Sequence, residues 1–286
     1  MIRFSQRVAS FGNPAWSALF TLALALVGGA GCGSVKEVTE LEREISFAPF
    51  ESNQVGSESL REFVLQRTAL LVNINDLKVL DEEDPSQFVV GGNLNESGDL
   101  VFGSAAAIDR RGYFVTAAHC VEDRKVSLVF WNGTEPEAKA ARVVFQGKRP
   151  LGESDFAVLH VPTRLSDVFR WGAMPEPGTE VVSAGVSDRG ALFALEPVGG
   201  RIMGVEDRDY EGIRSAILSH DSPLERGNSG GPLVDGKGRL LAVNTTGAAA
   251  YPMLGAWNYR YPHAVRPDLD WLRDLIETDA RRGSGT

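Results

Sequence analysis

Short runs of apolar or alternating residues fill most of the chain after its first third, and Gly, Pro or Asp separates one run from the next. Examples are VFGSAAAID, GYFVTAA, KVSLVFW, ARVVFQG, DFAVLHV, TEVVSAGV, SAILSH, GGPLVD and RLLAVNTTG. Many short strands with turn residues between them are typical of an antiparallel barrel or sandwich. Only the residues after Pro267 recur at helical spacing, with Leu269, Leu272 and Leu275 on one face. The sequence therefore predicts an all-β fold that ends in an α-helix.

The amino-terminal end differs from the rest of the chain. Arg3 and Arg7 are the only charged residues among residues 1–31, and an apolar stretch between them and Cys32 ends in GGAGC. A basic start, a short apolar core and small residues are typical of a secretory signal peptide. Cys32 resembles the lipidated cysteine of bacterial lipoproteins, although Gly29 stands where these usually have leucine. We therefore predict export, and lipid attachment at Cys32, with plain cleavage of the signal as the alternative.

Composition divides the remainder of the chain. Residues 32–60 are polar and are predicted to form a flexible tether to the membrane, and residues 61–286 to form the folded domain. Residues 75–100, which include FVVGGN, are acidic and rich in Gly and Asn, and are predicted to form a long loop. Acidic residues outnumber basic ones, 38 to 29, which argues against a nucleic-acid partner.

The segment RGNSGGPL raises the question of whether Ser229 is a nucleophile. A reactive serine needs a base, an acid that orients the base, and donors for an oxyanion. The chain has 4 histidines. His160 alternates within an apolar run and is predicted to lie on a strand face, and His263 lies among aromatic residues and is predicted to pack there. His220 is close to Ser229 in sequence and is the weaker candidate for the base, while His119 in GYFVTAAHCV is the stronger one.

Three motifs, VTAAHC, SDFAVLHV and GNSGGPLV, occur in the order His, Asp, Ser and together resemble the chymotrypsin-like (trypsin-like) serine proteases. FGSAAAIDRRGYFVTAAHCV and the segment around the serine are most similar to the bacterial high-temperature-requirement (Deg-type) branch. The resemblance covers about residues 69–276, and no PDZ domain is expected after it. It implies two six-stranded β-barrels and a C-terminal helix, with an active site between the barrels and no metal or cofactor.

The resemblance also implies a role for each matching residue. Ser229 would be the nucleophile, His119 the general base, and Asp155 the acid that orients the imidazole. The backbone N–H groups of Gly227 and Ser229 would form the oxyanion hole, and the Thr245 hydroxyl would support the buried aspartate. The expected reaction is cleavage of a polypeptide substrate through an acyl-enzyme. The membrane is expected as a second partner through the lipid anchor, and no segment predicts an oligomeric state.

Three departures from the family change what is expected. FVVGGN resembles the amino terminus that activates trypsin-type zymogens, but Asn228 stands where that mechanism needs an aspartate, so no such activation is predicted. Cys120 is paired in many relatives with a cysteine whose place Ser104 takes here, so a free, buried thiol is predicted. Pro223 stands where trypsins have an aspartate, so the resemblance implies small or medium apolar side chains rather than Arg or Lys before the cleaved bond.

Two other functions fit parts of the pattern. A catalytically silent binding or chaperone-like module would keep the fold, although it has no chemical need for all three catalytic residues. An esterase would use the same chemistry, and GNSGG fits the letters of the GxSxG nucleophile elbow. In that elbow the serine precedes a helix, whereas here the strand-like run PLVD follows.

Overall fold

The computed structural model describes residues 40–46, 58–84, 87–94, 100–122, 124–133, 135–148, 154–188, 192–210, 212–246 and 261–283. These residues all belong to one compact unit, Val38–Thr286. The predicted signal peptide and Cys32 lie outside the described residues. In the part of the chain that is described, no helix is both long and apolar enough to cross a membrane.

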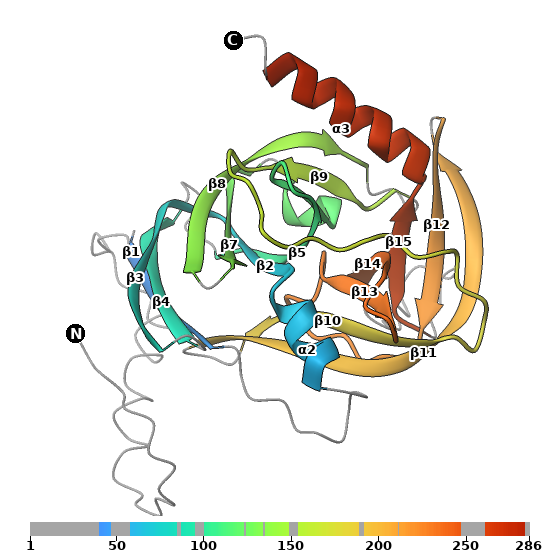
Figure 1. The fold of residues 1–286 in the computed structure, drawn as a ribbon, viewed down its shortest axis with the longest axis horizontal. Helices are drawn as coiled ribbons and strands as arrows, with labels where there is room; N and C mark the ends of the chain where they lie inside the picture. Colours follow the sequence, from blue (N-terminus) through green and yellow to red (C-terminus); the bar gives the residue numbers. More distant parts are fainter. Residues whose placement is uncertain are drawn as a thin grey trace, which may run out of the picture. The chain divides into compact units, whose positions relative to one another are not determined.

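Six strands close into a first barrel in the order β2-β5-β6-β9-β8-β7 (Figure 1). Every neighbouring pair in this barrel is antiparallel. Its interior is filled by buried apolar side chains such as Leu71, Phe114, Leu128 and Leu159, and removal of this apolar surface from water is the main stabilising contribution. The bounds are β2 (Thr68–Val72), β5 (Phe102–Asp109), β6 (Tyr113–Thr116), β7 (Val126–Asn132), β8 (Glu135–Gln146) and β9 (Ala157–His160).

A second barrel follows, in the order β10-β13-β14-β15-β12-β11, and it closes where β10 pairs with β11. One buried cluster contains Val115 and Phe156 of the first barrel together with Val182 and Val243 of the second, so the two barrels share an apolar interface. The prediction of two six-stranded barrels is confirmed. The bounds are β10 (Glu180–Asp188), β11 (Leu192–Tyr210), β12 (Ile213–His220), β13 (Pro232–Asp235), β14 (Leu240–Thr246) and β15 (His263–Pro267).

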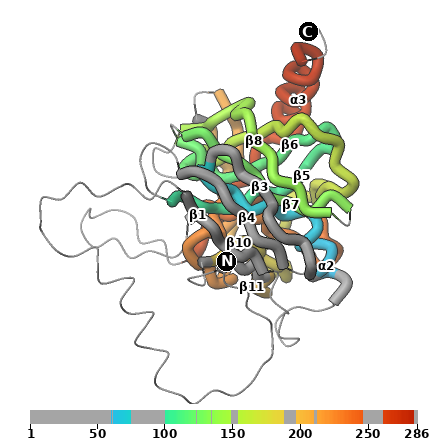
Figure 2. Tube along the Cα trace, turned by 90° about the vertical axis from the view of Figure 1, so that its left-hand side faces the viewer, coloured from blue at the N-terminus to red at the C-terminus, as the bar shows by residue number. Residues whose placement is uncertain are grey.

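The predicted C-terminal helix is α3 (Leu269–Gly283). Its first turn is capped by Asp268, whose Oδ1 accepts the N–H groups of Asp270 and Trp271 at 3.0 Å each. Its apolar face packs against the first barrel. A shorter helix, α2 (Glu58–Leu65), leads into β2. Figures 1 and 2 show α2 and α3 at opposite ends of the unit.

The long loop predicted for residues 75–100 is wrong. Most of this stretch is an antiparallel pair of strands, β3 (Ile74–Asp84) and β4 (Gln87–Leu94), and FVVGGN lies within β4. The acidic residues and glycines of this stretch suggested a loop, but it also contains β-branched and aromatic residues, which favour strands.

The amino-terminal boundary also differs from the prediction. Within the predicted tether, residues 40–46 form β1 (Glu40–Ser46), which pairs antiparallel with β4 and parallel with β11. Helix α2 also begins before the predicted start of the folded domain at residue 61. The polar composition of this segment does not indicate a strand. β1 forms by pairing with strands that are far away in the sequence, so its own residues carry little signal.

Candidate active site

Ser229 lies in the loop between β12 and β13, directly after a tight turn. The Asn228 N–H donates to the Glu225 carbonyl at 3.1 Å, and Gly227 has φ +98°. This is the pattern of a type II turn, in which the third residue needs a positive φ. A Cβ at Gly227 would lie 2.4 Å from the Val186 carbonyl oxygen, so no side chain fits there. Among the described residues, neither the Gly227 N–H nor the Ser229 N–H has a hydrogen-bond partner, and both can donate to a ligand.

The Asn228 side chain fixes this turn from inside the protein. Its Oδ1 accepts the Glu225 N–H at 2.7 Å, and its Nδ2 donates to the Val186 carbonyl at 3.2 Å. Asn228 is only 8% exposed. A neutral amide therefore holds the loop at the position where a trypsin-type protein would bury a charged pair, and no buried charge needs compensation.

The first barrel holds the same loop from the other side through Ser104 of β5. The Ser104 N–H donates to the Ser229 carbonyl at 2.7 Å, and the Ser104 hydroxyl donates to the Gly227 carbonyl at 2.8 Å. The same hydroxyl accepts the Val186 N–H of β10 at 2.8 Å. Gly230 packs so closely that an added Cβ would lie 2.0 Å from the Ser104 carbonyl oxygen. In the sequence, Ser104 was noted only because it takes the place of a cysteine that pairs in many relatives. Its hydrogen bonds were not predicted.

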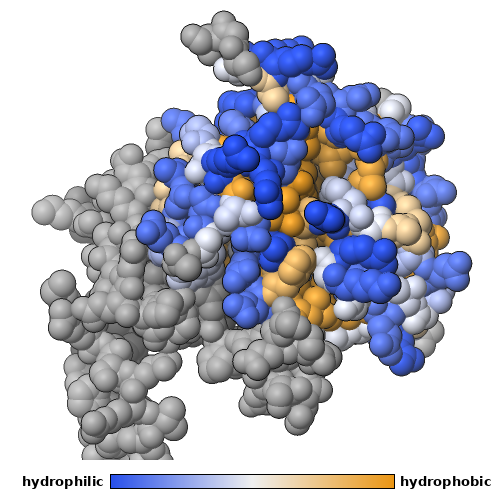
Figure 3. Space-filling view, in the orientation of Figure 1, coloured by the Kyte–Doolittle hydropathy of each residue, from blue (hydrophilic) through white to orange (hydrophobic). Residues whose placement is uncertain are grey.

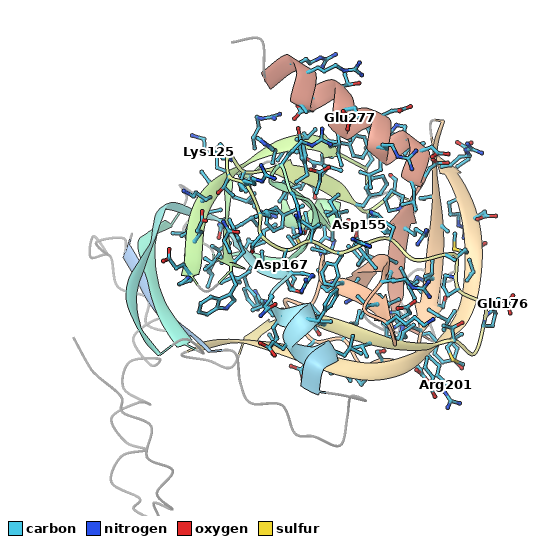
Figure 4. All side chains as sticks on the ribbon, viewed as in Figure 1. Lys125, Asp155, Asp167, Glu176, Arg201 and Glu277 are labelled. Carbon is cyan, nitrogen blue, oxygen red and sulfur yellow. The ribbon has the colours of Figure 1, made fainter. Side chains whose placement is uncertain are left out.

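His119 and Asp155 form a directly bonded pair at the ends of first-barrel strands. His119 lies in the short helix η2 (Ala118–Cys120), just after β6, and its Nδ1 is 2.7 Å from Asp155 Oδ2. The His119 backbone N–H donates to Asp155 Oδ1 at 2.9 Å. Asp155 is fully buried in the interior of the unit (Figure 4), whereas the His119 side chain is 20% exposed. The carboxylate therefore fixes the imidazole, with Nδ1 toward the interior.

The pKa of His119 lies above its usual range. Burial lowers this pKa, but the hydrogen bonds with Asp155 and with the neighbouring Cys120 side chain outweigh burial because they stabilise the protonated ring. Cys120 is free and buried, as predicted, and its Sγ lies 3.8 Å from the Ser229 carbonyl oxygen. The residue next to His119 therefore contacts the serine loop.

The Ser229 hydroxyl donates to the Thr245 backbone carbonyl at 3.3 Å. Within the described part of the chain, no hydrogen bond joins the Ser229 hydroxyl to His119. Catalytic hydrogen bonds are often long or misaligned before substrate binds, so this geometry is compatible with a resting enzyme. The Thr245 hydroxyl, which was predicted to support the buried Asp155, donates instead to the His263 carbonyl at 3.2 Å.

The other histidines lie elsewhere. The His160 ring packs at a tilted angle against Tyr113, with ring centroids 4.6 Å apart. His220 is fully buried at the end of β12, and burial, together with the nearby His263, lowers the pKa of His220 to about 4. His263 begins β15. The described residues contain no group of three or more His, Cys, Asp or Glu side chains that could hold a metal ion.

This arrangement can now be compared with known proteins. Residues 103–243 match the family model of the trypsin-like peptidase domain. This segment of the chain is therefore a trypsin-like peptidase domain. The matched segment includes His119, Asp155 and Ser229, and the two-barrel fold agrees with the chymotrypsin-like architecture that the motifs predicted.

Named relatives of this chain are proteases of the Deg type. The chain is 32% identical, over 149 residues, to the "Probable periplasmic serine endoprotease DegP-like" of Bartonella henselae, covering 51% of this chain and 28% of that protein. It is 25% identical, over 173 residues, to "Serine endoprotease DegS" of Escherichia coli K12, covering 54% of this chain and 43% of that protein. The chain thus spans less than half the length of these curated relatives.

Solved structures show the same fold. The structure titled "HtrA-type protease AlgW with decapeptide" has a TM-score of 0.54 and 19% identity, and the match covers 78% of this chain and 68% of that chain. A second AlgW structure, with a tripeptide, has a TM-score of 0.55 and 18% identity and covers 78% of this chain and 65% of that chain.

Proposed function

We propose that this chain is a serine endopeptidase that hydrolyses peptide bonds through Ser229, His119 and Asp155. The observation that carries the proposal is the bonded His119–Asp155 pair, 2.7 Å apart, opposite a serine loop with two unused N–H donors. A base held by a buried carboxylate, together with preorganised oxyanion donors, is what acyl transfer by serine requires.

The reaction begins when the Ser229 hydroxyl turns from the Thr245 carbonyl toward His119 Nε2. The imidazole takes the hydroxyl proton as Oγ attacks the peptide carbonyl, and Asp155 stabilises the imidazolium that forms. The N–H groups of Gly227 and Ser229 donate to the oxyanion. His119 then protonates the leaving amine, and a water molecule, activated by the same ring, hydrolyses the acyl-enzyme. Thr245 supports this site because its backbone carbonyl accepts the resting Ser229 hydroxyl.

The place of action follows from the amino-terminal sequence and from the relatives. A signal peptide in residues 1–31 and lipid attachment at Cys32 would export the peptidase and anchor it in the bacterial envelope. The relative from Bartonella henselae is named as periplasmic, which supports the same compartment. A polypeptide is the substrate that we expect, in keeping with the peptides present in the AlgW structures.

A silent binding module is the second candidate, because the Ser229 hydroxyl is bonded to Thr245 and not to His119. The two functions are separated by incubating the full-length chain with a denatured protein and sequencing the products by mass spectrometry. We expect new peptide ends that disappear in Ser229→Ala and His119→Ala but persist in His160→Ala, since His160 packs on Tyr113 outside the site. Binding of the denatured protein without any cleavage would favour the silent module. Cleavage that persists in Ser229→Ala would reject Ser229 as the nucleophile.

A further inference from the structure

A cavity of about 500 Å³ lies beside α2, separate from the catalytic residues. Four of its lining residues are arginines, Arg67, Arg110, Arg170 and Arg239, and we call this cavity the arginine pocket. They come from four different segments: the end of α2, the turn between β5 and β6, the stretch linking the two barrels, and the turn between β13 and β14. Figure 4 shows Asp167, another lining residue, next to the end of α2.

The pocket carries a charge opposite to that of the whole chain. Four arginines and one aspartate line it, which gives a local formal charge of +3, whereas the chain as a whole carries −9. Asp235, which pairs with Arg239, lowers this excess without removing it. Hydrophilic side chains lie on both sides of a hydrophobic band on the face that carries α2 (Figure 3). A concave site lined mainly by one sign of charge concentrates ions of the other sign.

Two of the four arginines form ion pairs within the protein. Arg67 Nη2 pairs with Asp167 at 2.6 Å, Nη1 and Nε donate to the carbonyls of Phe63 and Val168, and the guanidinium lies 3.6 Å from the centre of the Phe63 ring. Arg239 pairs with Asp235 at 2.6 Å. These contacts fix the walls of the pocket.

The other two arginines have unused hydrogen-bond donors. Arg110 and Arg170 are exposed, and neither guanidinium makes an ion pair or a hydrogen bond with any residue that the structure describes. The pKa of Arg67 is lowered overall. Burial lowers it, the paired Asp167 raises it, and the nearby positive charge of Arg110 lowers it again. An anion in the pocket would relieve this repulsion.

We propose that the arginine pocket binds a phosphate group, with Arg110 and Arg170 as the residues that hold it. A planar guanidinium presents two parallel N–H donors to a phosphate, and two such groups can share its oxygen atoms and its charge. The cavity is larger than a bare phosphate ion, so an ester substituent also fits, with Phe63 as an apolar wall. A lipid headgroup and free phosphate share this chemistry. Helix α2, which lines the pocket through Phe63, begins 26 residues after the predicted lipid-attachment site at Cys32, which favours a headgroup.

The test uses the full-length chain with Cys32→Ser, so that an acyl anchor cannot cause membrane binding. Binding of inorganic phosphate is measured by calorimetry, and co-sedimentation is measured with vesicles of phosphatidylcholine alone or mixed with phosphatidylglycerol. The pocket variant is Arg110→Gln with Arg170→Gln. The control is Arg281→Gln with Arg282→Gln, which removes the same charge from exposed positions in the last turn of α3. Thermal melts show whether each variant is folded.

We expect the pocket variant to bind at least about tenfold more weakly, because it loses its charge-assisted hydrogen bonds to the phosphate. The control is expected to bind like the parent. Loss of both phosphate and phosphatidylglycerol binding, or of either one alone, supports the proposal and identifies the source of the phosphate. If the pocket variant does not fold, Arg110→Lys with Arg170→Lys is used instead. This variant keeps the charge but removes the planar guanidinium with its two parallel N–H donors, and weaker binding is again expected.

The proposal is overturned if the parent binds neither probe, or if the pocket and control variants lose affinity equally. Peptide cleavage is measured in the same samples. Because the pocket contains none of the residues assigned to catalysis, its variants are expected to cleave like the parent, and failure of the phosphate site would leave the peptidase proposal intact.

Discussion

Replacing Ser104 with alanine tests the link between the first barrel and the serine loop. The Ser104 hydroxyl is fully buried and makes two hydrogen bonds of 2.8 Å, one to the Gly227 carbonyl and one from the Val186 N–H. Alanine leaves both backbone groups without this partner, and an unsatisfied buried group costs about 1–3 kcal/mol. We therefore expect Ser104→Ala to lower the free energy of unfolding by about 2–4 kcal/mol.

The same substitution is expected to reduce catalysis, because the Ser104 hydroxyl holds the carbonyl of Gly227, and the N–H of the same residue is one of the proposed oxyanion donors. Loss of a whole donor typically lowers turnover by about 10²–10³, and we expect a displaced donor to cost at least about tenfold. Ser127→Ala is the matched control, since Ser127 is another buried first-barrel serine, whose hydroxyl donates to the Ile74 carbonyl at 2.9 Å. It should lose about 1 kcal/mol of stability and keep its turnover.

Urea unfolding, followed by tryptophan fluorescence, gives the stability of each variant, and kcat and KM on one peptide substrate give its activity. If Ser104→Ala turned over peptide as fast as Ser127→Ala does, Ser104 would not position the oxyanion loop. If Ser104→Ala were as stable as the parent, the two hydrogen bonds would not carry the expected free energy.

Three further predictions follow from the same geometry. The raised pKa of His119 predicts that kcat/KM increases with pH, with a midpoint above the usual 6.5 of histidine, because only the neutral ring accepts a proton; Asp155→Asn should move this midpoint down in a pH–rate profile, and an unmoved midpoint would contradict the pairing. Asn228→Leu removes both hydrogen bonds that hold the turn and should lower kcat by about tenfold or more, while an unchanged kcat would mean that the turn holds without the amide. His220, with a pKa of about 4 when folded and 6.5 when unfolded, does not affect stability above pH 6.5. Below pH 6.5, His220 binds a proton in the unfolded chain but stays neutral in the folded chain. The free energy of unfolding should therefore fall by up to about 1.4 kcal/mol per pH unit down to about pH 4. Urea titrations at pH 7, 6 and 5 should show a shallower fall in His220→Gln, and equal slopes would argue against a buried neutral ring.

The barrels could be predicted, and the catalytic candidates proposed, because their signals are local in the sequence. Each barrel strand is a short apolar run between turn residues, and the helix after Pro267 has its own periodicity. His119, Asp155 and Ser229 each stand within a distinctive motif. Gly227 is recognisable because its positive φ excludes other residues.

Features that depend on distant partners could not be predicted in this way. β1 is a strand because it pairs with β4 and β11, and β4 because it pairs with β1 and β3. Their polar or glycine-rich residues give little local indication of this. Ser104 acquires its hydrogen bonds only when β5 meets the serine loop. The arginine pocket joins four segments that are far apart in the sequence, so no window along the chain contains its signal.

The central claim is that Ser229 is an activated nucleophile, and a fluorophosphonate probe tests it most directly. The full-length chain is treated with the probe, digested, and the modified residue is located by mass spectrometry, with Ser229→Ala and His119→Ala alongside. The account predicts one adduct on Ser229, absent from Ser229→Ala and strongly reduced in His119→Ala. A folded chain that is not labelled, or that is labelled as well without His119, would contradict it.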